Sequence, residues 1–282
     1  MDFLGSFWQH LPEQIHPIAF TVGFFSVHWY ALCWLTGFFF ALLLVIRYRK
    51  KFCPGLSEED AVDLLLFLFL GAFIGGHLGY AFFYRPDIFL ADPIGYFVPY
   101  HFATGWSGIS GMSFHGGLIG VVLALLFFVT KRKLNFLAVA DLVSFVAPVA
   151  LFFGRIGNFL AGELYGRMTD VSLGMYFPGA PGGYALRHPS ALYEALGEGL
   201  VLWGILLLVT RYQKFPGEVS AWFLIGYSCV RFLVEYVREP DRGVALLYDV
   251  LTRGQVLSVL VFVGGLGWFI WLQRKNRAKI VG

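Results

Sequence analysis

Seven long runs of mainly apolar residues are the feature that most constrains how this sequence can fold. They lie at about 18–46, 61–84, 112–130, 134–160, 190–210, 218–237 and 255–272. About 20 mainly apolar residues suffice for a helix to cross the hydrocarbon core of a bilayer. The composition agrees, because 14% of the 282 residues are charged, whereas soluble domains carry about 25%. The sequence therefore predicts an all-α polytopic membrane protein with seven transmembrane helices, organised as a single membrane domain over residues 1–282.

The distribution of basic residues predicts which way the helices cross the membrane. Every lysine and several arginines fall in segments at one membrane face, near 47–51, 131–133, 211–214 and 274–279. Cytoplasmic loops carry such an excess of Lys and Arg, so we expect the N-terminus outside and the C-terminus in the cytoplasm. The first basic residue is Arg47, so the first run lacks the basic region that begins a cleavable leader, and we expect it to be retained as a span.

The segments predicted at the outer face are longer than the cytoplasmic loops. They cover about 85–111, 161–189 and 238–254 and are rich in glycine, proline and aromatic residues. Long connecting segments are where binding and catalytic residues concentrate. We therefore expect a small outer part that carries the function. The sequence has no basic cluster with interleaved aromatic residues, so we expect no nucleic-acid partner.

Two arginines lie inside predicted spans, where a charge costs at least about 2.5–3.5 kcal/mol. Arg155 stands in the stretch GRIGN, three residues before Asn158. Arg231 shares one helix face with Tyr227 and Glu235, which lie four residues before and after it. A structural ion pair between Arg231 and Glu235 is one interpretation. Because guanidinium groups bind phosphate through a planar fork of donors, we favour a phospholipid headgroup shared by both arginines.

Further polar residues near the predicted spans support either a functional or a structural interpretation. His115, wrapped in glycine, is a candidate general base beside the arginines, although a hydrogen-bonded core histidine is the commoner case. Glu163 is a candidate carboxylate partner for the arginines. Glu194 and Glu198 share one face of the predicted helix at 190–210, and we interpret them as structural.

Local signals predict where two helices begin. Ser57 is followed three residues later by Asp60, which is the spacing of a capping box. Pro189 and Ser190 are the entry signal of the fifth apolar run.

Five stretches of the sequence together resemble one known family. They are HWY (28–30), GMSFHGGLIG (111–120), GRIGNFLAGELYGR (154–167), RHPSALYE (187–194) and VRFLVEYVREPD (230–241). In this order, and over most of the chain, they resemble the prolipoprotein diacylglyceryl transferases of bacterial inner membranes. Two positions depart from the family's pattern, which often has asparagine in place of Ala161 and usually has arginine in place of His77.

This resemblance implies an activity. Enzymes of the family move the diacylglyceryl group of phosphatidylglycerol to the thiol of the lipobox cysteine in the signal peptide of a preprolipoprotein. A thioether forms and glycerol phosphate leaves. The resemblance further implies seven spanning helices in the bacterial inner membrane, an active site toward the periplasm, and no metal or organic cofactor.

The resemblance also implies roles for individual residues. Arg155 and Arg231 match the family's functional arginines, and His115 is our third candidate catalytic residue. The candidate substrate-binding residues are His28, Tyr30, Asn158, Glu163, Gly166, Tyr227 and Glu235. Since the nucleophilic thiol belongs to the substrate, the enzyme needs no cysteine of its own.

Two other functions compete with this interpretation. A lipid or anion transporter that uses the two intramembrane arginines as a relay would be expected to carry repeated halves, and the sequence has no evident internal repeat. A metal-dependent phospholipid phosphotransferase would need clustered carboxylates for Mg²⁺. Asp60 and Asp63 are the close aspartate pair, and they lie at the predicted cytoplasmic face.

Overall fold

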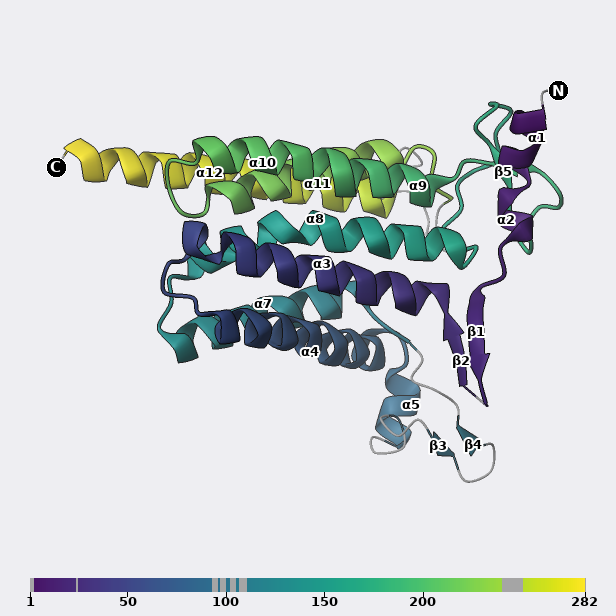
Figure 1. Ribbon diagram of the computed structural model, residues 1–282, viewed down its shortest axis with the longest axis horizontal. Helices are drawn as coiled ribbons and strands as arrows, with labels where there is room; N and C mark the ends of the chain where they lie inside the picture. Colours follow the sequence, from purple (N-terminus) through teal and green to yellow (C-terminus); the bar gives the residue numbers. More distant parts are fainter. Residues whose placement is uncertain are drawn as a thin grey trace. The chain divides into compact units, whose positions relative to one another are not determined.

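Long apolar helices make up most of the chain (Figure 1). The computed structural model describes residues 3–23, 25–92, 96, 100–101, 105–106, 111–239 and 251–281. The long helical elements are α3 (Trp29–Phe52), α4 (Glu58–Phe83), α7 (Phe114–Arg132), α8 (Phe136–Leu160), α10 (Leu202–Tyr212), α11 (Glu218–Val234) and α12 (Arg253–Val281). A short helix α9 (Ser190–Glu194) and a π-helix η1 (Ala195–Val201) lead directly into α10.

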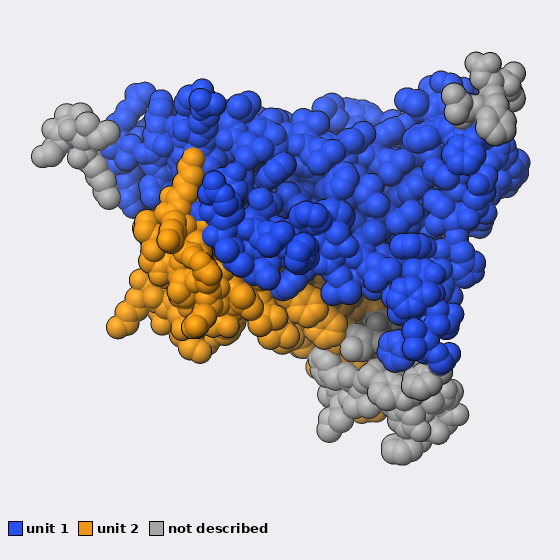
Figure 2. Space-filling view, viewed as in Figure 1, with its two compact units in different colours: residues 1–48, 140–282 blue, residues 49–139 orange. Residues whose placement is uncertain are grey.

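Short elements connect these helices. They are the helices α1 (Phe3–Gln9), α2 (Leu11–Gln14) and α5 (Pro86–Ala91), and the two-stranded antiparallel pairs β1 (Ile18–Val22) with β2 (Phe25–His28), β3 (Tyr100–His101) with β4 (Gly105–Trp106), and β5 (Met175–Tyr176) with β6 (Leu186–Arg187). The chain divides into two units, which Figure 2 colours separately: unit 1 comprises residues 1–48 and 140–282, and unit 2 comprises residues 49–139.

Six helices of the described chain are long and apolar enough to cross a membrane, as expected for a multi-pass membrane protein. They are Trp29–Phe52, Glu58–Phe83, Phe114–Arg132, Phe136–Leu160, Ser190–Tyr212 and Arg253–Ala278. The predicted span at 218–237 is α11, which is helical over 17 residues and is therefore shorter than each of these six.

The first predicted span begins too early, because residues 18–23 and 25–28 are not helical. They form the hairpin of β1 and β2, in which Thr21 pairs with Ser26 and Val22 with Phe25. This segment is rich in β-branched and aromatic residues, which favour strands. Gly23 has a φ of +61°, a conformation that glycine adopts without steric cost. The helix itself begins at Trp29 and continues past the predicted end to Phe52.

The predicted helix starts are confirmed. The Ser57 hydroxyl accepts a hydrogen bond from the Asp60 amide at 3.0 Å, and the Ser57 amide donates to the Asp60 carboxylate at 3.2 Å. This reciprocal pair is the predicted capping box. Helix α9 begins at Ser190, directly after Pro189.

A buried aspartate on α8 secures the beginning of α11. Asp141 is 0% exposed, and its carboxylate accepts hydrogen bonds from the amides of Gly217 (2.6 Å) and Ser220 (2.7 Å), the Ser220 hydroxyl and the Gln213 side chain. An acceptor at this position satisfies amide groups that a helix start leaves unpaired. Asp141 therefore ties α8 to the α10–α11 connection, 14 residues along α8 from Arg155.

Glycines bring the two helices of unit 2 into backbone contact. Gly71, Gly75 and Gly79 of α4 face Gly116 and Gly120 of α7, and a Cβ atom on Gly120 would lie 1.9 Å from the carbonyl oxygen of Gly71. Small residues at such spacings are what membrane helices use to pack closely.

In unit 1, α3 packs along α8. The Tyr48 and Phe145 rings lie 4.7 Å apart, and the Phe40 and Phe153 rings stack at 5.4 Å. At the other end of this contact, Gly157 of α8 accommodates Tyr30, since a Cβ atom on Gly157 would lie 3.1 Å from the tyrosine ring. The α9–η1–α10 element and α12 both contact α11 (Figure 1).

Candidate active site

A single buried carboxylate in unit 1 brings three arginines together. Glu194, at the end of α9, accepts a hydrogen bond from Nη1 of Arg231 at 2.8 Å through Oε1, and another from Nη1 of Arg238 at 2.8 Å. Its other oxygen, Oε2, forms an ion pair with Nη1 of Arg155 at 3.0 Å. Arg155 comes from α8 and Arg231 from α11. The two arginines predicted to share an anion therefore do converge, and in this structure the shared anion is a glutamate.

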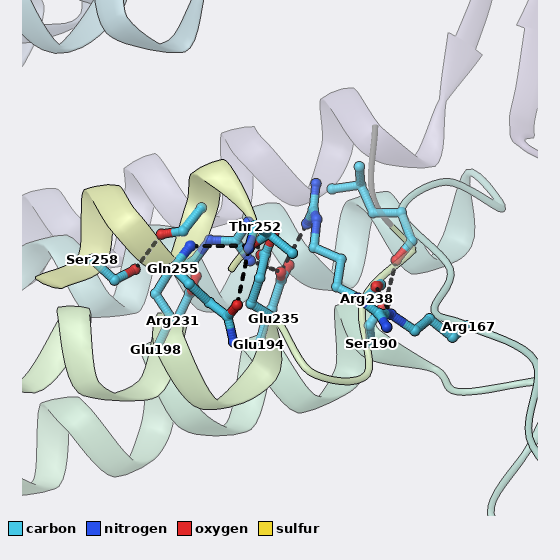
Figure 3. A network of polar contacts seen from close by, with 12 residues as sticks. Arg167, Ser190, Glu194, Glu198, Arg231, Glu235, Arg238, Thr252, Gln255 and Ser258 are labelled. Atoms are coloured by element: carbon cyan, nitrogen blue, oxygen red, sulfur yellow. Dashed lines mark hydrogen bonds and ion pairs between the residues drawn. The ribbon is translucent and has the colours of Figure 1, made fainter. Parts of the chain in front are cut away.

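Two further glutamates complete the cluster. The Glu198 carboxylate, in η1, accepts hydrogen bonds from Nε and Nη2 of Arg155 at 3.2 and 3.0 Å. The Glu235 carboxylate pairs with Nη2 of Arg231 at 2.8 Å, so the ion pair that the sequence suggested is present. Figure 3 shows Glu194, Arg231 and Glu235 beside one another. Three arginines and three glutamates balance in formal charge, which is how buried charges are normally tolerated.

The carboxylates lie deeper in the protein than the arginines. The side chains of Glu194 and Glu198 are 0% exposed, whereas those of Arg155 and Arg231 are 17% and 18% exposed. A guanidinium group carries five N–H donors. In the contacts described here, Arg155 directs three nitrogens and Arg231 two nitrogens to carboxylates. Since each Nη atom carries two N–H groups, these contacts do not use all the donors of either guanidinium group.

Two of these glutamates, four residues apart, contact the same arginine. Glu194 ends α9 and Glu198 lies in η1, and both contact Arg155. The glycines on either side of Glu198 allow close approach, because a Cβ atom on Gly197 would lie 2.5 Å from Val230 of α11, and one on Gly199 would lie 2.6 Å from Phe152 of α8. π-Helical turns occur frequently at functional sites. From the sequence alone, we interpret Glu194 and Glu198 as structural only. The feature of the sequence that could have indicated a functional role is a pair of acids four residues apart, beside glycines, in an apolar run.

The end of α8 folds Glu163 back toward Asn158. The Glu163 amide donates to the Asn158 carbonyl at 2.9 Å, and the Gly162 amide donates to the Phe159 carbonyl at 3.0 Å. With Gly162 at φ +70°, this is a Schellman motif, and Ala161 directly precedes its glycine. The Asn158 side chain donates to Glu163 at 3.4 Å. The predicted pairing of Glu163 with the arginines is thus wrong in this structure, where Glu194 and Glu198 take that place.

Comparison with known proteins decides the family. The sequence profile of the family described as "Prolipoprotein diacylglyceryl transferase" matches residues 17–271. The chain belongs to the prolipoprotein diacylglyceryl transferase family. It is 42% identical over 293 aligned residues to the phosphatidylglycerol–prolipoprotein diacylglyceryl transferase of Chlorobaculum tepidum, covering 100% of this chain and 98% of the relative. It is 46% identical over 268 residues to the enzyme of the same name from Vibrio vulnificus, covering 95% of each chain.

Gly166 lies where this transferase has no room for a side chain. A Cβ atom on it would lie 2.3 Å from the Val237 carbonyl oxygen and 2.7 Å from Cβ of His188. The Gly166 amide donates to the His188 carbonyl at 2.8 Å, and Gly166 forms a β-bridge with Arg238. Because Arg238 donates to Glu194, the position of Gly166 is coupled to the arginine cluster.

We expect Gly166→Ala to lower transferase activity about 100-fold, because displacement of the Val237–Arg238 backbone by an ångström misplaces the cluster. The measurement is the initial rate of diacylglyceryl transfer, with the free energy of unfolding measured in parallel. Gly204→Ala is the matched control, since a Cβ atom there meets nothing within 4 Å. Activity of Gly166→Ala within threefold of wild type would contradict this role.

A buried arginine that the sequence did not single out joins the segment before α9 to the segment after α11. Arg187 is 2% exposed. Its Nη1 donates to the Gly166 carbonyl and to the Glu239 carboxylate, both at 3.0 Å. The next residue, His188, is partly buried, and burial lowers its pKa below the usual 6.5, so its ring is neutral at pH 7.

The other predicted unit 1 residues lie on the same helices as the cluster or next to them. Tyr227 stands one turn before Arg231 and stacks on Phe223 at 5.9 Å. Tyr30, in the first turn of α3, is 40% exposed and packs on Gly157. His28 ends strand β2, opposite Ile18.

Glu235 also holds the beginning of α12. Its Oε1 accepts a hydrogen bond from the Thr252 hydroxyl at 2.9 Å, a contact drawn in Figure 3. A Cβ atom on Gly254 would lie 2.6 Å from the same oxygen. The cluster is therefore built from α8, α9, η1, α11 and the start of α12.

Two histidines of interest belong to unit 2. His115 lies in the first turn of α7, is exposed and touches the Phe114 ring edge-on at 5.7 Å. His77 is 6% exposed, and its Nδ1 lies 3.3 Å from the Gly111 carbonyl oxygen, in the segment that leads into α7. Among the residues that the structure describes, no three His, Cys, Asp or Glu side chains gather as a metal site.

Proposed function

We propose that this transferase moves the diacylglyceryl group of phosphatidylglycerol to the thiol of the lipobox cysteine in preprolipoprotein signal peptides. The observation that carries the proposal is the convergence of Arg155 and Arg231 on Glu194. It places two guanidinium groups from separate helices against one buried carboxylate, and both remain partly exposed, at 17% and 18%. The relatives, which are named phosphatidylglycerol–prolipoprotein diacylglyceryl transferases, support the choice of both substrates.

In the proposed reaction, sulfur displaces a phosphate ester from carbon. The thiol sulfur attacks the glyceryl carbon that carries the phosphate, a C–S bond forms, the C–O bond to phosphate breaks, and the thiol proton passes to a base. The leaving group changes from a phosphodiester with one negative charge toward a monoester with more. The unused N–H donors of Arg155 and Arg231 meet this growing charge, and such donors stabilise the transition state more than the ground state.

The glutamates hold the arginines in place before the substrate binds. Glu194 and Glu198 engage Arg155 from two directions, so its guanidinium plane does not need to reorganise when charge develops on phosphate. Donors that are already oriented in a site of low dielectric contribute most to catalysis. We assign Arg155, Arg231 and His115 to catalysis. We assign substrate contact to His28, Tyr30, Asn158, Glu163, Gly166, Tyr227 and Glu235.

We further propose seven spans in one membrane domain of the bacterial inner membrane, with the N-terminus periplasmic and the C-terminus cytoplasmic. Helix α11 has 17 residues, which is at the lower end of the length range of membrane-spanning helices. Basic residues occupy the last turns of α3 and α7, as expected for cytoplasmic ends. Arg155 and Arg231 lie near the ends of α8 and α11 that this orientation places toward the periplasm.

The direct test uses purified protein in detergent with phosphatidylglycerol and a lipobox peptide as the second substrate. We expect mass spectrometry to detect a diacylglyceryl thioether on the peptide cysteine and release of glycerol phosphate. A peptide with serine in place of that cysteine is the control and should stay unmodified. Absence of the thioether, together with lipid flux across liposomes without peptide, would favour a transporter instead.

His115→Gln is expected to lower the rate of thioether formation at least about 100-fold while binding of phosphatidylglycerol is unchanged, as for loss of a general base. A free thiol has a pKa near 8.5, so the activity of this variant should recover as the pH rises through that value. His16→Gln is the control, because His16 lies in the segment between α2 and β1. Full activity of His115→Gln at pH 7 would remove the base from the scheme.

A further inference from the structure

An apolar groove lies in unit 1 beside the arginine cluster. Its volume is about 300 Å³, and its walls come from Phe40 and Leu44 of α3, Val149 and Phe153 of α8, and Leu200 and Trp203 of η1 and α10. The groove is lined by apolar surface alone and is partly open. Phe40 and Leu200, both at its walls, are 42% and 47% exposed, so a lipid chain can enter from the membrane.

The groove adjoins the polar site. Gly199, which also lines it, follows Glu198 in η1 and packs on Phe152, since a Cβ atom on Gly199 would lie 2.6 Å from Cβ of Phe152. Phe152, a further lining residue, stands about one helical turn before Arg155 on α8. At 1.5 Å per residue, the wall from Phe153 to Val149 covers roughly 3 to 9 Å along α8 from Arg155. This direction leads away from the outer end of α8, which is Leu160. The groove therefore lies next to the charged cluster, farther from Leu160 along α8.

A charged cluster beside an apolar groove favours a phospholipid as the ligand. A phospholipid whose phosphate lies at Arg155 extends its acyl chains away from the polar face, along the direction that the groove follows. Lipid tails are as apolar as leucine, so moving a chain from the bilayer into the groove gains little from the hydrophobic effect. The gain comes from van der Waals contact with fixed side chains and from holding the glyceryl carbon at a defined place.

We propose that this groove holds one acyl chain of the phosphatidylglycerol substrate while its phosphate lies at Arg155 and Arg231. The proposal rests on the phosphate site proposed above. It makes the groove a determinant of which acyl chains the enzyme uses.

The test narrows the deep end of the groove without touching the arginine cluster. Leu44→Trp places a larger side chain there. We expect its kcat/KM for dipalmitoyl phosphatidylglycerol to fall about 10-fold, the usual worth of a changed apolar contact in a pocket, while its kcat/KM for dihexanoyl phosphatidylglycerol stays at the wild-type value. Leu43→Trp is the matched control, because Leu43 is the preceding residue of α3, is 46% exposed and lies outside the groove lining. It should match wild type with both lipids.

Each other outcome overturns the proposal. If Leu44→Trp leaves kcat/KM unchanged for both lipids, or lowers kcat/KM equally for both, the groove does not select acyl chains. If it raises the KM for the lipobox peptide and leaves lipid preference unchanged, the occupant is the apolar part of the signal peptide. Leu44→Phe fills less space and replaces Leu44→Trp if the latter unfolds. A wild-type protein that forms no thioether with either lipid contradicts the proposed function itself, whereas loss of discrimination alone contradicts only the groove.

Discussion

Glu194→Gln is expected to lower kcat for diacylglyceryl transfer by about 100-fold or more. Glutamine keeps the size of the side chain but loses its charge, so Arg155, Arg231 and Arg238 lose the carboxylate on which they converge. Displacement of a catalytic group by about an ångström costs this much. Removing one partner of a buried ion pair also costs up to about 3–5 kcal/mol in the free energy of unfolding, and Glu194 is 0% exposed. The measurement is kcat at saturating phosphatidylglycerol, with thermal unfolding recorded on the same sample.

Two further variants separate positioning from general loss of stability. Glu58→Gln removes a carboxylate that pairs with the buried Arg49 and lies outside the arginine cluster. It lowers the free energy of unfolding by removing one partner of a part-buried pair, while its kcat should stay at the wild-type value. Glu194→Asp keeps the charge on a shorter side chain, and we expect it to recover most of the free energy of unfolding but little of kcat. If Glu194→Gln keeps more than a third of wild-type activity, the carboxylate does not position the arginines.

Arg155→Lys and Arg231→Lys are each expected to lower kcat by about 10²–10³-fold, the range for loss of an oriented donor to developing charge. Lysine keeps the positive charge that the buried glutamates require, but it is a point charge without the planar fork. It cannot reproduce the contacts of Arg155 with Glu198 through two nitrogens and with Glu194 through a third. The measurement is the rate of thioether formation by each variant.

The alanine variants Arg155→Ala and Arg231→Ala should show no detectable lipidation while still folding. Arg132→Lys is the control. Arg132 also pairs with two carboxylates, Asp60 and Asp63, but it lies in unit 2 and outside the cluster. Its rate should remain within twofold of wild type. Near-normal lipidation by either alanine variant would refute the role of that arginine in the reaction.

The accuracy of the sequence predictions follows from the range of the interactions involved. The helix starts at Ser57 and Ser190 were predicted because a cap depends on residues within one turn. The prediction of a helix over residues 18–22 and 25–28 is wrong, because a short apolar run rich in β-branched residues fits a strand as well as a helix. The partners of Arg155 were also assigned wrongly: Glu163 was the nearer carboxylate in sequence, whereas Glu198 lies 43 residues away.

By itself, the sequence determined that this chain forms long apolar helices, that two arginines interrupt them, and that it resembles the diacylglyceryl transferases. Only the tertiary structure decided which carboxylate those arginines share, that a π-helix presents Glu198 beside it, and where an apolar groove meets the cluster. The physical reason is that the cost of a buried charge can be read from one residue and its neighbours, whereas the group that compensates it lies on another helix. Its identity depends on how the helices pack.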